Sequence, residues 1–468
     1  MLLVLVACSS PANKPDASDD GGGTDGPLDP GERSGTRLKL RYYDFGTVRE
    51  LLGIHDSLRD ETCAAAEFAD GMTYCMPIDT KQLVYADTAC TQPIGLTAES
   101  GTCASPPPAY FAEHDPWSCV TTMTRLFRRG AVITRSEHFT KGPSGSCNAG
   151  GASSSDVYYA LTEVPLTELA ALSVSEPFMT GRLGTRYHES VDGMRFPLTA
   201  ELHDAVLGAR CIPWSYLTDA TVGTCVPRDV AFVSGFSDAT CTQRHATTTA
   251  GCSAPTAAVS YEACQTNPAH YFPLAAKLTP TSIYSGSSGM CVGSAPSAGS
   301  DYYGVGAELV LASMAREIGT GSERLQPVHF TTPEGLRTRD RGLFDSRLGV
   351  MCHPNAQANG GVLCVPNGTE WQTMYTDADC TNAVELIRQL RQSTCAVAPA
   401  PLYAARLEQS AACRYNNVVR RVGAPYVGAV YRRFGTTCTP YTSADHVLYR
   451  LADAVPASDL AAGTLVTE

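Results

Sequence analysis

The sequence predicts an all-β protein built from three internal repeats that disulfides hold together. One segment, Tyr74–Cys90, returns at Thr224–Cys241 and again at Leu363–Cys380. Each copy starts with one residue followed by Cys, an apolar residue and Pro, and it ends in aromatic-x-Asp-x-x-Cys. Alternating runs such as Leu38–Tyr43 have the period of a half-buried strand. A motif that recurs in the same order at long intervals is typical of internal repetition.

Length and composition describe an ordinary globular chain with an acidic balance. The 468 residues are 43% hydrophobic, which excludes wholesale disorder. The formal net charge is -12 and the isoelectric point is about 5.3. Because only short local groups of arginine interrupt this acidic background, we expect no nucleic-acid partner.

The cysteines indicate an oxidising compartment. Cys8 stands alone, and the other eighteen of the 19 cysteines form three sets of six with nearly equal spacing. The sets are Cys63, Cys75, Cys90, Cys103, Cys119 and Cys147; Cys211, Cys225, Cys241, Cys252, Cys264 and Cys291; and Cys352, Cys364, Cys380, Cys395, Cys413 and Cys438. Even sets favour a disulfide framework, whereas structural zinc sites bring cysteines only a few residues apart.

The sequence alone does not fix which cysteines pair, but the spacing favours sequential neighbours. We therefore predict Cys63–Cys75, Cys90–Cys103 and Cys119–Cys147 in the first repeat, and the equivalent pairs in the other two. Each pair would close a loop of about hairpin length. In the chain-entropy model such a loop stabilises the fold by on the order of 3 kcal/mol.

The first residues predict a membrane tether. The apolar run 1–7 leads directly into Cys8, and the sequence LVAC resembles the lipobox of bacterial lipoproteins, in which the cysteine carries lipid. The run is too short to span a bilayer and short for a signal peptide, so we expect the true start to lie upstream. Residues 9–36 are rich in Gly, Pro, Asp and Ser and predict a disordered acidic linker. We therefore expect lipid on Cys8 to attach the chain to a membrane.

The remaining chain divides into β repeats at 37–180, 181–321 and 322–468. Each repeat is longer than one solenoid unit, and its second half loosely echoes its first, as at Thr124–Cys147. Two units of about four strands per repeat would give six four-stranded sheets, as in a six-bladed β-propeller. Three tandem β-sandwich or barrel modules are the competing architecture, although the junctions between repeats are short for linkers.

Two sets of carboxylates recur at equivalent positions and are the candidate site residues. Asp56, Asp204 and Asp345 each precede the first cysteine of a set by seven residues. A His precedes the first two, which suggests a base and its orienting partner. Neighbours on a strand point to opposite faces, however, and the Asp recurs where the His does not. A hydrogen bond at a turn or strand end is therefore the favoured interpretation.

The second set is Asp87, Asp238 and Asp377, within the aromatic-x-Asp-x-x-Cys motif. Three carboxylates around a propeller axis could bind a cation, but such an Asp more often caps its own turn. We assign no metal and no cofactor, since the histidines lack metal-ligand spacing.

Motifs of nucleophilic and nucleotide chemistry are absent from the sequence. It contains no G-x-S-x-G, no P-loop, no H-E-x-x-H and no dinucleotide fingerprint. Aromatic doublets such as Tyr110-Phe111 and Tyr302-Tyr303 would place one ring outward from a strand. Outward rings could stack on a sugar or contact a protein, although cross-strand packing is the commoner role. A protein or a glycan is thus the expected type of ligand.

The lipobox, the Asp/Gly/Pro-rich linker and the repeated aromatic-x-Asp-x-x-Cys-Thr motif together resemble those of uncharacterised cysteine-patterned repeat lipoproteins of myxobacteria. The resemblance covers nearly the whole chain, but its motifs are structural. It implies an exported protein of the cell envelope, anchored to the outer membrane and facing the periplasm or the surface. It implies no active-site residues.

Two functions follow as expectations. The first is a non-enzymatic, lipid-anchored module for binding, adhesion or structural support in the envelope, favoured by the tether, the repetition and the missing catalytic motifs. The alternative is an exported carbohydrate-active enzyme that uses carboxylates on a propeller scaffold.

Overall fold

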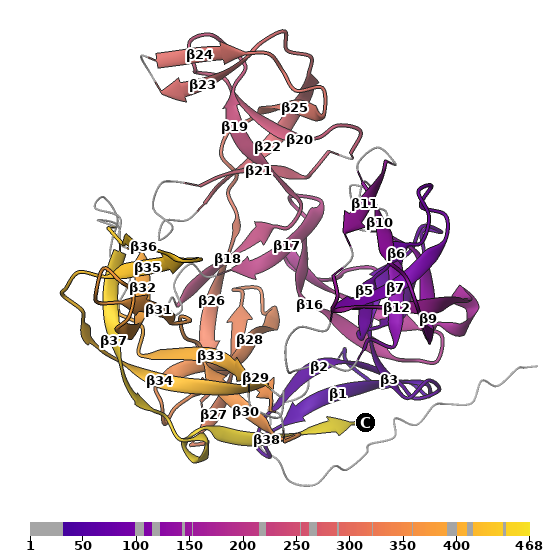
Figure 1. Ribbon diagram of the computed structural model, residues 1–468. Coiled ribbons are helices and arrows are strands. Elements are labelled where there is room, and N and C mark those ends of the chain that lie inside the picture. Colours follow the sequence, from indigo (N-terminus) through magenta and orange to yellow (C-terminus); the bar gives the residue numbers. More distant parts are fainter. Residues whose placement is uncertain are drawn as a thin grey trace, which may run out of the picture.

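The chain forms a closed central ring of strands from which three arms project (Figure 1). The computed structural model describes residues 31–98, 107–114, 122–142, 146–151, 153–214, 221–252, 254–261, 269–287, 290–320, 322–357, 359–390, 400–409, 415–442 and 446–468. Strands dominate these residues, and the only helical elements among them are the 3-10 turns η2 (Leu166–Glu168) and η3 (Ala457–Asp459). The predicted all-β class is confirmed. The predicted lipid attachment at Cys8 and nearly all of the predicted linker lie outside the described residues.

The ring is one antiparallel sheet of 16 strands that returns on itself. Five strands from each repeat form a unit, and β14 (Phe178–Thr180) pairs with β15 beside the ring. Unit 1 contains β1 (Leu38–Asp44), β2 (Arg49–Asp56), β3 (Glu61–Glu67), β4 (Thr73–Pro77) and β13 (Ala171–Val174). Unit 2 contains β15 (Leu183–Ser190), β16 (Arg195–Asp204), β17 (Ala209–Trp214), β18 (Val222–Pro227) and β26 (Ala312–Ile318). Unit 3 contains β27 (Leu325–Thr331), β28 (Arg337–Asp345), β29 (Val350–Ala356), β30 (Val362–Pro366) and β38 (Ala461–Thr467).

The last strand of each unit pairs with the first strand of the next. Strand β13 pairs with β15, β26 with β27, and β38 with β1, which closes the circle. The predicted alternation is observed at the start of unit 1, because Leu38, Leu40 and Tyr42 are buried on one face of β1. Each unit curls around its own apolar cluster.

Neighbouring units also exchange a core residue. The turn between the first two strands of a unit inserts an apolar side chain into the core of the preceding unit. Met194 of unit 2 lies in the core of unit 1, Leu336 of unit 3 in that of unit 2, and Val48 of unit 1 in that of unit 3. In the turn before Met194, Gly193 has a φ of +93°, a conformation that favours glycine. The three cores are therefore interlocked in a circle.

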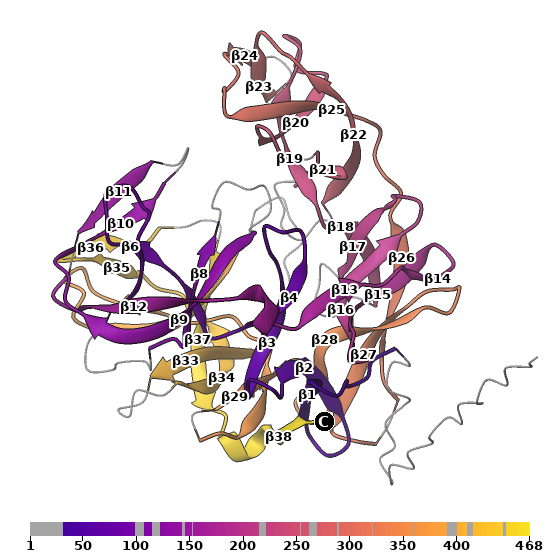
Figure 2. The same cartoon turned by 90° about the vertical axis from the view of Figure 1, so that its right-hand side faces the viewer.

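An arm is inserted between the fourth and fifth strand of every unit (Figures 1 and 2). Arm 1 contains β5 (Thr80–Gln82), β6 (Val84–Tyr85), β7 (Pro93–Ala98), β8 (Tyr110–His114), β9 (Met123–Ile133), β10 (Glu137–Lys141), β11 (Cys147–Gly151) and β12 (Asp156–Val164). Arm 2 contains β19 (Val230–Phe236), β20 (Arg244–Thr249), β21 (Ala257–Ser260), β22 (His270–Leu278), β23 (Ile283–Ser287), β24 (Met290–Ser294) and β25 (Ser300–Val305). Arm 3 contains β31 (Gln372–Tyr375), β32 (Ala383–Leu390), β33 (Tyr403–Gln409), β34 (Tyr415–Pro425), β35 (Tyr431–Phe434), β36 (Thr437–Pro440) and β37 (His446–Ala454).

In arm 2 the strands β19, β20, β25, β22 and β21 close into a barrel, and the hairpin β23–β24 extends from β19. Arms 1 and 3 follow the same strand order, each with its own hairpin. The described strands thus do not form six four-stranded blades, and the propeller is not confirmed. Three separate modules are also not what is observed, because all the units share one sheet. The sequence could not show that the second half of each repeat interrupts the first.

Three of the nine predicted cysteine pairs, one in each repeat, are correct. The disulfides Cys63–Cys75, Cys211–Cys225 and Cys352–Cys364 join the third and fourth strands of their units, as predicted. Each closes a local hairpin loop, the situation in which sequence spacing is informative. Their sulfur atoms lie within the unit cores.

The predicted pairs in the arms are wrong. Cys90 bonds to Cys147, Cys241 to Cys291 and Cys380 to Cys438, over 57, 50 and 58 residues. This overturns Cys90–Cys103 and Cys119–Cys147 and their equivalents, because barrel folding brings the hairpin to the Asp-containing turn. Cys252 is also disulfide-bonded. Cys103, Cys119, Cys264, Cys395 and Cys413 lie outside the described residues.

The six described disulfides indicate an oxidising, extracellular compartment. Loops of this length are worth about 3–4 kcal/mol each in the chain-entropy model. Within the described ranges, no helix has the length and apolarity needed to cross a bilayer.

Candidate functional site

Asp56, Asp204 and Asp345 do not converge on one site, because each is buried at the second strand of a different unit. Their side chains are 1%, 0% and 0% exposed. Each forms an ion pair with the arginine that precedes the first strand of its unit. The pairs are Arg37–Asp56 at 2.6 Å, Arg182–Asp204 at 2.8 Å and Arg324–Asp345 at 2.8 Å between Nη2 and Oδ2.

The same carboxylates also hold the turn that follows them. Asp56 accepts a hydrogen bond from the backbone N–H of Leu58, and Asp204 accepts from Val206. Asp345 accepts from the N–H of Arg347. Every carboxylate thus ties the start of the first strand to the end of the second. These contacts fit the interpretation as strand-end hydrogen bonds.

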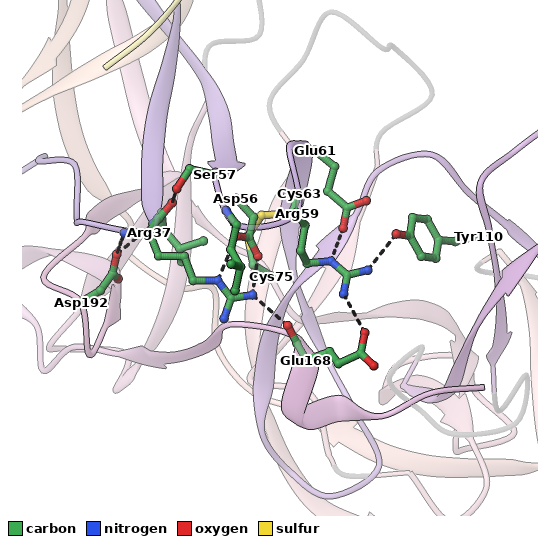
Figure 3. A network of polar contacts seen from close by, with 12 residues as sticks. Arg37, Asp56, Ser57, Arg59, Glu61, Cys63, Cys75, Tyr110, Glu168 and Asp192 are labelled. Atoms are coloured by element: carbon green, nitrogen blue, oxygen red, sulfur yellow. Dashed lines mark hydrogen bonds and ion pairs between the residues drawn. A yellow bond between two sulfur atoms is a disulfide. The ribbon is translucent and has the colours of Figure 1, made fainter. Parts of the chain in front are cut away.

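In unit 1 the ion pair extends into a network that reaches arm 1 (Figure 3). Arg37 also donates to the backbone carbonyl of Glu168 at 2.8 Å. Arg59 contacts Glu61, donates to the hydroxyl of Tyr110 on β8 at 2.8 Å, and lies 3.4 Å from the Glu168 carboxylate. Because Glu168 contacts both arginines, it fixes the connection between arm 1 and β13.

The second set, Asp87, Asp238 and Asp377, caps three equivalent exposed turns. Each carboxylate accepts from the N–H and hydroxyl of the Thr after the motif cysteine, and from the next N–H. These hydrogen bonds lower the pKa of all three carboxyls.

The cysteine of each of these turns has a left-handed backbone, with a φ of 52° at Cys90, Cys241 and Cys380. The capped turn holds that unusual conformation and presents the sulfur to the arm hairpin. The motif therefore positions a disulfide. Among the described residues, no group of three or more His, Cys, Asp or Glu side chains is arranged to hold a metal ion.

The aromatic doublets of the arms do not supply outward rings. Both members are buried in Tyr110-Phe111, Tyr158-Tyr159, Tyr271-Phe272 and Tyr302-Tyr303. Within the arms, the strands that carry them are covered on both faces, which the local sequence does not reveal.

A pocket of about 320 Å³ in arm 1 is built around a buried carboxylate, Glu113. Burial disfavours its ionisation, but hydrogen bonds from Arg125, at 2.7 Å, and from Tyr85 outweigh this and lower its pKa. The carboxylate is thus already engaged by the protein's own side chains.

A hollow with a charged lining lies between units 1 and 2 and has a volume of about 490 Å³. Residues of strands β3 and β4 of unit 1 line one side, and residues of β15, β16 and β17 of unit 2 line the other. The charged or titratable lining residues are Glu67, Arg186, His188, Glu201, Arg210 and Arg228. We call this hollow the inter-unit cleft.

Glu201 organises two of the arginines. It contacts Arg228 directly, and its Oε2 lies 3.6 Å from Nη1 of Arg210. Arg210 makes a second ion pair with Asp229 at 3.0 Å. The arginine side chains remain about 40% exposed, so they can still reach a molecule in the cleft.

His188 lies deeper in the cleft, on β15. Burial, and next the charge of Arg186, lower its pKa from 6.5 to about 4. The imidazole is therefore neutral near pH 7. Its Nδ1 is buried and has no hydrogen-bond partner in the described part of the chain.

Three of the charged cleft residues have no charged counterpart in the other two repeats. Their positions are defined by the repeated motifs of unit 2. Glu201 lies three residues before the buried Asp, Arg210 directly before the first Cys, and Arg228 directly after the Cys-apolar-Pro sequence. The corresponding residues are Gly53, Thr62 and Ile78 in unit 1, and Gly342, Met351 and Asn367 in unit 3. The same backbone hydrogen bond occurs in each unit and confirms this equivalence. The N–H of residue 228 donates to the carbonyl of residue 210, that of residue 78 to residue 62, and that of residue 367 to residue 351.

Sequence reasoning missed these residues because it searched for what recurs. The recurring Asp and Cys build the framework, whereas the cleft charges are what one copy has and the others lack. Aligning the three repeats and searching for isolated charged substitutions would have found Glu201, Arg210 and Arg228. It would not have shown that they face unit 1.

Residues 21–460 match a family described as a family of unknown function, DUF7481. The chain belongs to this family. No curated protein and no solved structure matches the chain. The match covers part of the predicted linker, the arms and every ring strand except β38 (Ala461–Thr467).

Replacing the buried carboxylate in this DUF7481 protein should be far more damaging than replacing the exposed one. Asp204→Asn leaves the Arg182 guanidinium half-buried without its counter-ion, so we expect a loss of about 3 kcal/mol in unfolding free energy. Asp238→Asn keeps an acceptor in a solvated turn and should change little. Urea unfolding measures both. Equal losses for the two variants would contradict the structural role of the ion pair.

The lowered pKa of His188 predicts a pH-dependent stability. Between pH 6.5 and about 4 the unfolded chain protonates this His while the folded chain does not, so wild-type stability falls as pH falls. Unit 3 carries Phe330 at the equivalent position. The variant His188→Phe has no imidazole there, so this loss of stability at low pH disappears. The variant should gain about 2 kcal/mol relative to wild type between pH 7 and pH 5. Parallel pH–stability curves would show that His188 titrates normally.

Proposed function

We propose that this protein is an exported, lipid-anchored binding protein of the cell envelope, without catalytic activity. The lipobox-like sequence ending at Cys8 and the acidic linker 9–36 support the tether. The disulfides support an oxidising destination, as in an outer-membrane lipoprotein of the myxobacterial type.

The observation that carries the binding function is the divergence of one copy within a triplicated framework. Buried ion pairs, ring disulfides and exchanged core residues recur in all three units. Three charged residues of the inter-unit cleft, Glu201, Arg210 and Arg228, do not recur. Folding requires what is common to the repeats, so a set present in one copy is the place where a specific ligand would bind.

The alternative, a carbohydrate-active enzyme, has less support. Glycoside hydrolysis uses two carboxyl groups flanking one bond, and one of them must donate a proton. The six recurring aspartates are engaged in ion pairs or turn caps. In the cleft, the Glu201 carboxylate is likewise engaged, by Arg210 and Arg228.

The tether is tested with the chain expressed behind a complete lipoprotein export signal. Wild type should incorporate radioactive fatty acid and fractionate with membranes, because the lipid supplies the membrane affinity. Cys8→Ser should lose both the label and the membrane fraction. Unlabelled wild type, or a variant that keeps its label, would remove the tether from the proposal.

The binding role is tested by soaking crystals with a mixed set of neutral, cationic and anionic sugar and peptide fragments. We expect bound fragments to concentrate in the inter-unit cleft. The double variant Arg210→Met/Arg228→Asn carries the corresponding residues of unit 3, and fragments should no longer bind in its cleft. Recovered fragments should be chemically unchanged. Fragments found only elsewhere, or cleaved in the cleft, would contradict a non-enzymatic binding site there.

A further inference from the structure

We infer that the inter-unit cleft binds a small molecule through an oxyanion, a carboxylate or a phosphate, held by the guanidinium groups of Arg186 and Arg228. This inference rests on the proposed binding function and names the chemistry of its ligand. It follows from three properties of the cleft: a positioned but unpaired guanidinium, a local excess of positive charge, and a neutral polar group beside an apolar wall.

Arg186 is positioned but not neutralised. Its Nε donates to the backbone carbonyl of Ser175 at 3.0 Å, which fixes the side chain on β15. Neither of its two terminal nitrogens has a hydrogen bond or ion pair with any described residue. The outer edge of a guanidinium presents two parallel N–H groups, and this spacing matches the two oxygens of a carboxylate or phosphate.

The balance of charge in the cleft is positive although the whole chain is acidic. Three arginines and two glutamates line it, against a formal net charge of -12 for the chain. Glu201 contacts Arg228, and Arg210 lies closer to Asp229 than to Glu201, so Arg186 is the arginine of this lining that has no carboxylate partner among the described residues. Glu67 on β3 is exposed and forms no ion pair with a described residue. An anion bound here would supply the negative partner that Arg186 lacks.

The rest of the lining suits an organic anion better than a bare ion. Ile54, Phe196 and Leu198 form an apolar wall on which a carbon skeleton can lie. Half-buried His188 is neutral near pH 7 and its buried Nδ1 has no partner among the described residues, so it can exchange a hydrogen bond with a hydroxyl or an oxyanion. A volume of about 490 Å³ is ample for a single sugar acid.

The test compares glucuronate with glucose, and acetate with inorganic phosphate, by titration calorimetry on the full chain. Glucuronate should bind at least about tenfold more tightly than glucose, which differs from it by the absence of the carboxylate. Arg186→Gln and Arg228→Asn should each weaken glucuronate binding by about tenfold or more. Its affinity should also fall with added salt, as expected for partly exposed charges.

Two further variants test whether negative charge in the cleft opposes binding and provide a control outside the cleft. Glu67→Gln removes a negative charge facing the anion and should strengthen binding by about two- to fivefold. Arg128→Gln changes an exposed side chain on β9 of arm 1 and should leave binding unchanged. Thermal melting checks that each variant is folded. If Arg186→Gln does not fold, Arg228→Asn decides, because its side chain is exposed and unit 3 carries Asn at this position.

The outcomes separate this inference from the function on which it rests. Phosphate binding without glucuronate binding would support an oxyanion site and identify phosphate as the preferred group. Equal affinities for glucose and glucuronate, or arginine variants that bind glucuronate normally, would overturn the inference while leaving a binding protein. If no fragment occupies the cleft in the crystals, the proposed function fails as well.

Discussion

A buried ion pair between arginine and aspartate holds each unit of the ring. The arginine stands just before the first strand and the aspartate ends the second, so the pair determines how the hairpin begins and how its following turn is held. Moving a charged group from water into the protein interior costs free energy. This cost is offset only when the group has an ion-pair partner and its remaining polar atoms are hydrogen-bonded. Here the carboxylate also receives backbone N–H groups, which completes its coordination.

The ion pairs act together with the exchange of core residues around the ring. Because Met194, Leu336 and Val48 each fill the core of the preceding unit, the orientation of one hairpin affects the packing of its neighbour. A pair that fixes the hairpin therefore also fixes the boundary between units. The inter-unit cleft lies at one such boundary, so its arginines are carried by a rigid sheet.

The class of fold, the repeats and the local disulfides could be predicted from sequence because they depend on short-range patterns. Alternation placed Leu38 and Leu40 in the core, and close spacing paired Cys63 with Cys75. Long-range features could not be predicted: no local pattern shows that Cys90 meets Cys147, or that an arm interrupts a five-stranded unit. The cleft belongs to this second group, since two units must meet before Arg186 and Glu67 face the same space.

The closure of the ring by β38 and β1 has a kinetic consequence. Strand β1 pairs with β2, and β38 with β30, inside their own units, but the outer edges of β1 and β38 stay unpaired until residues 464–467 meet residues 41–44. Contacts so distant along the chain slow folding. Each arm, by contrast, is contiguous and carries its own disulfide, so it can mature early. Until the ring closes, β1 presents an open edge to other chains, and the time that this edge stays open is the main hazard of the topology.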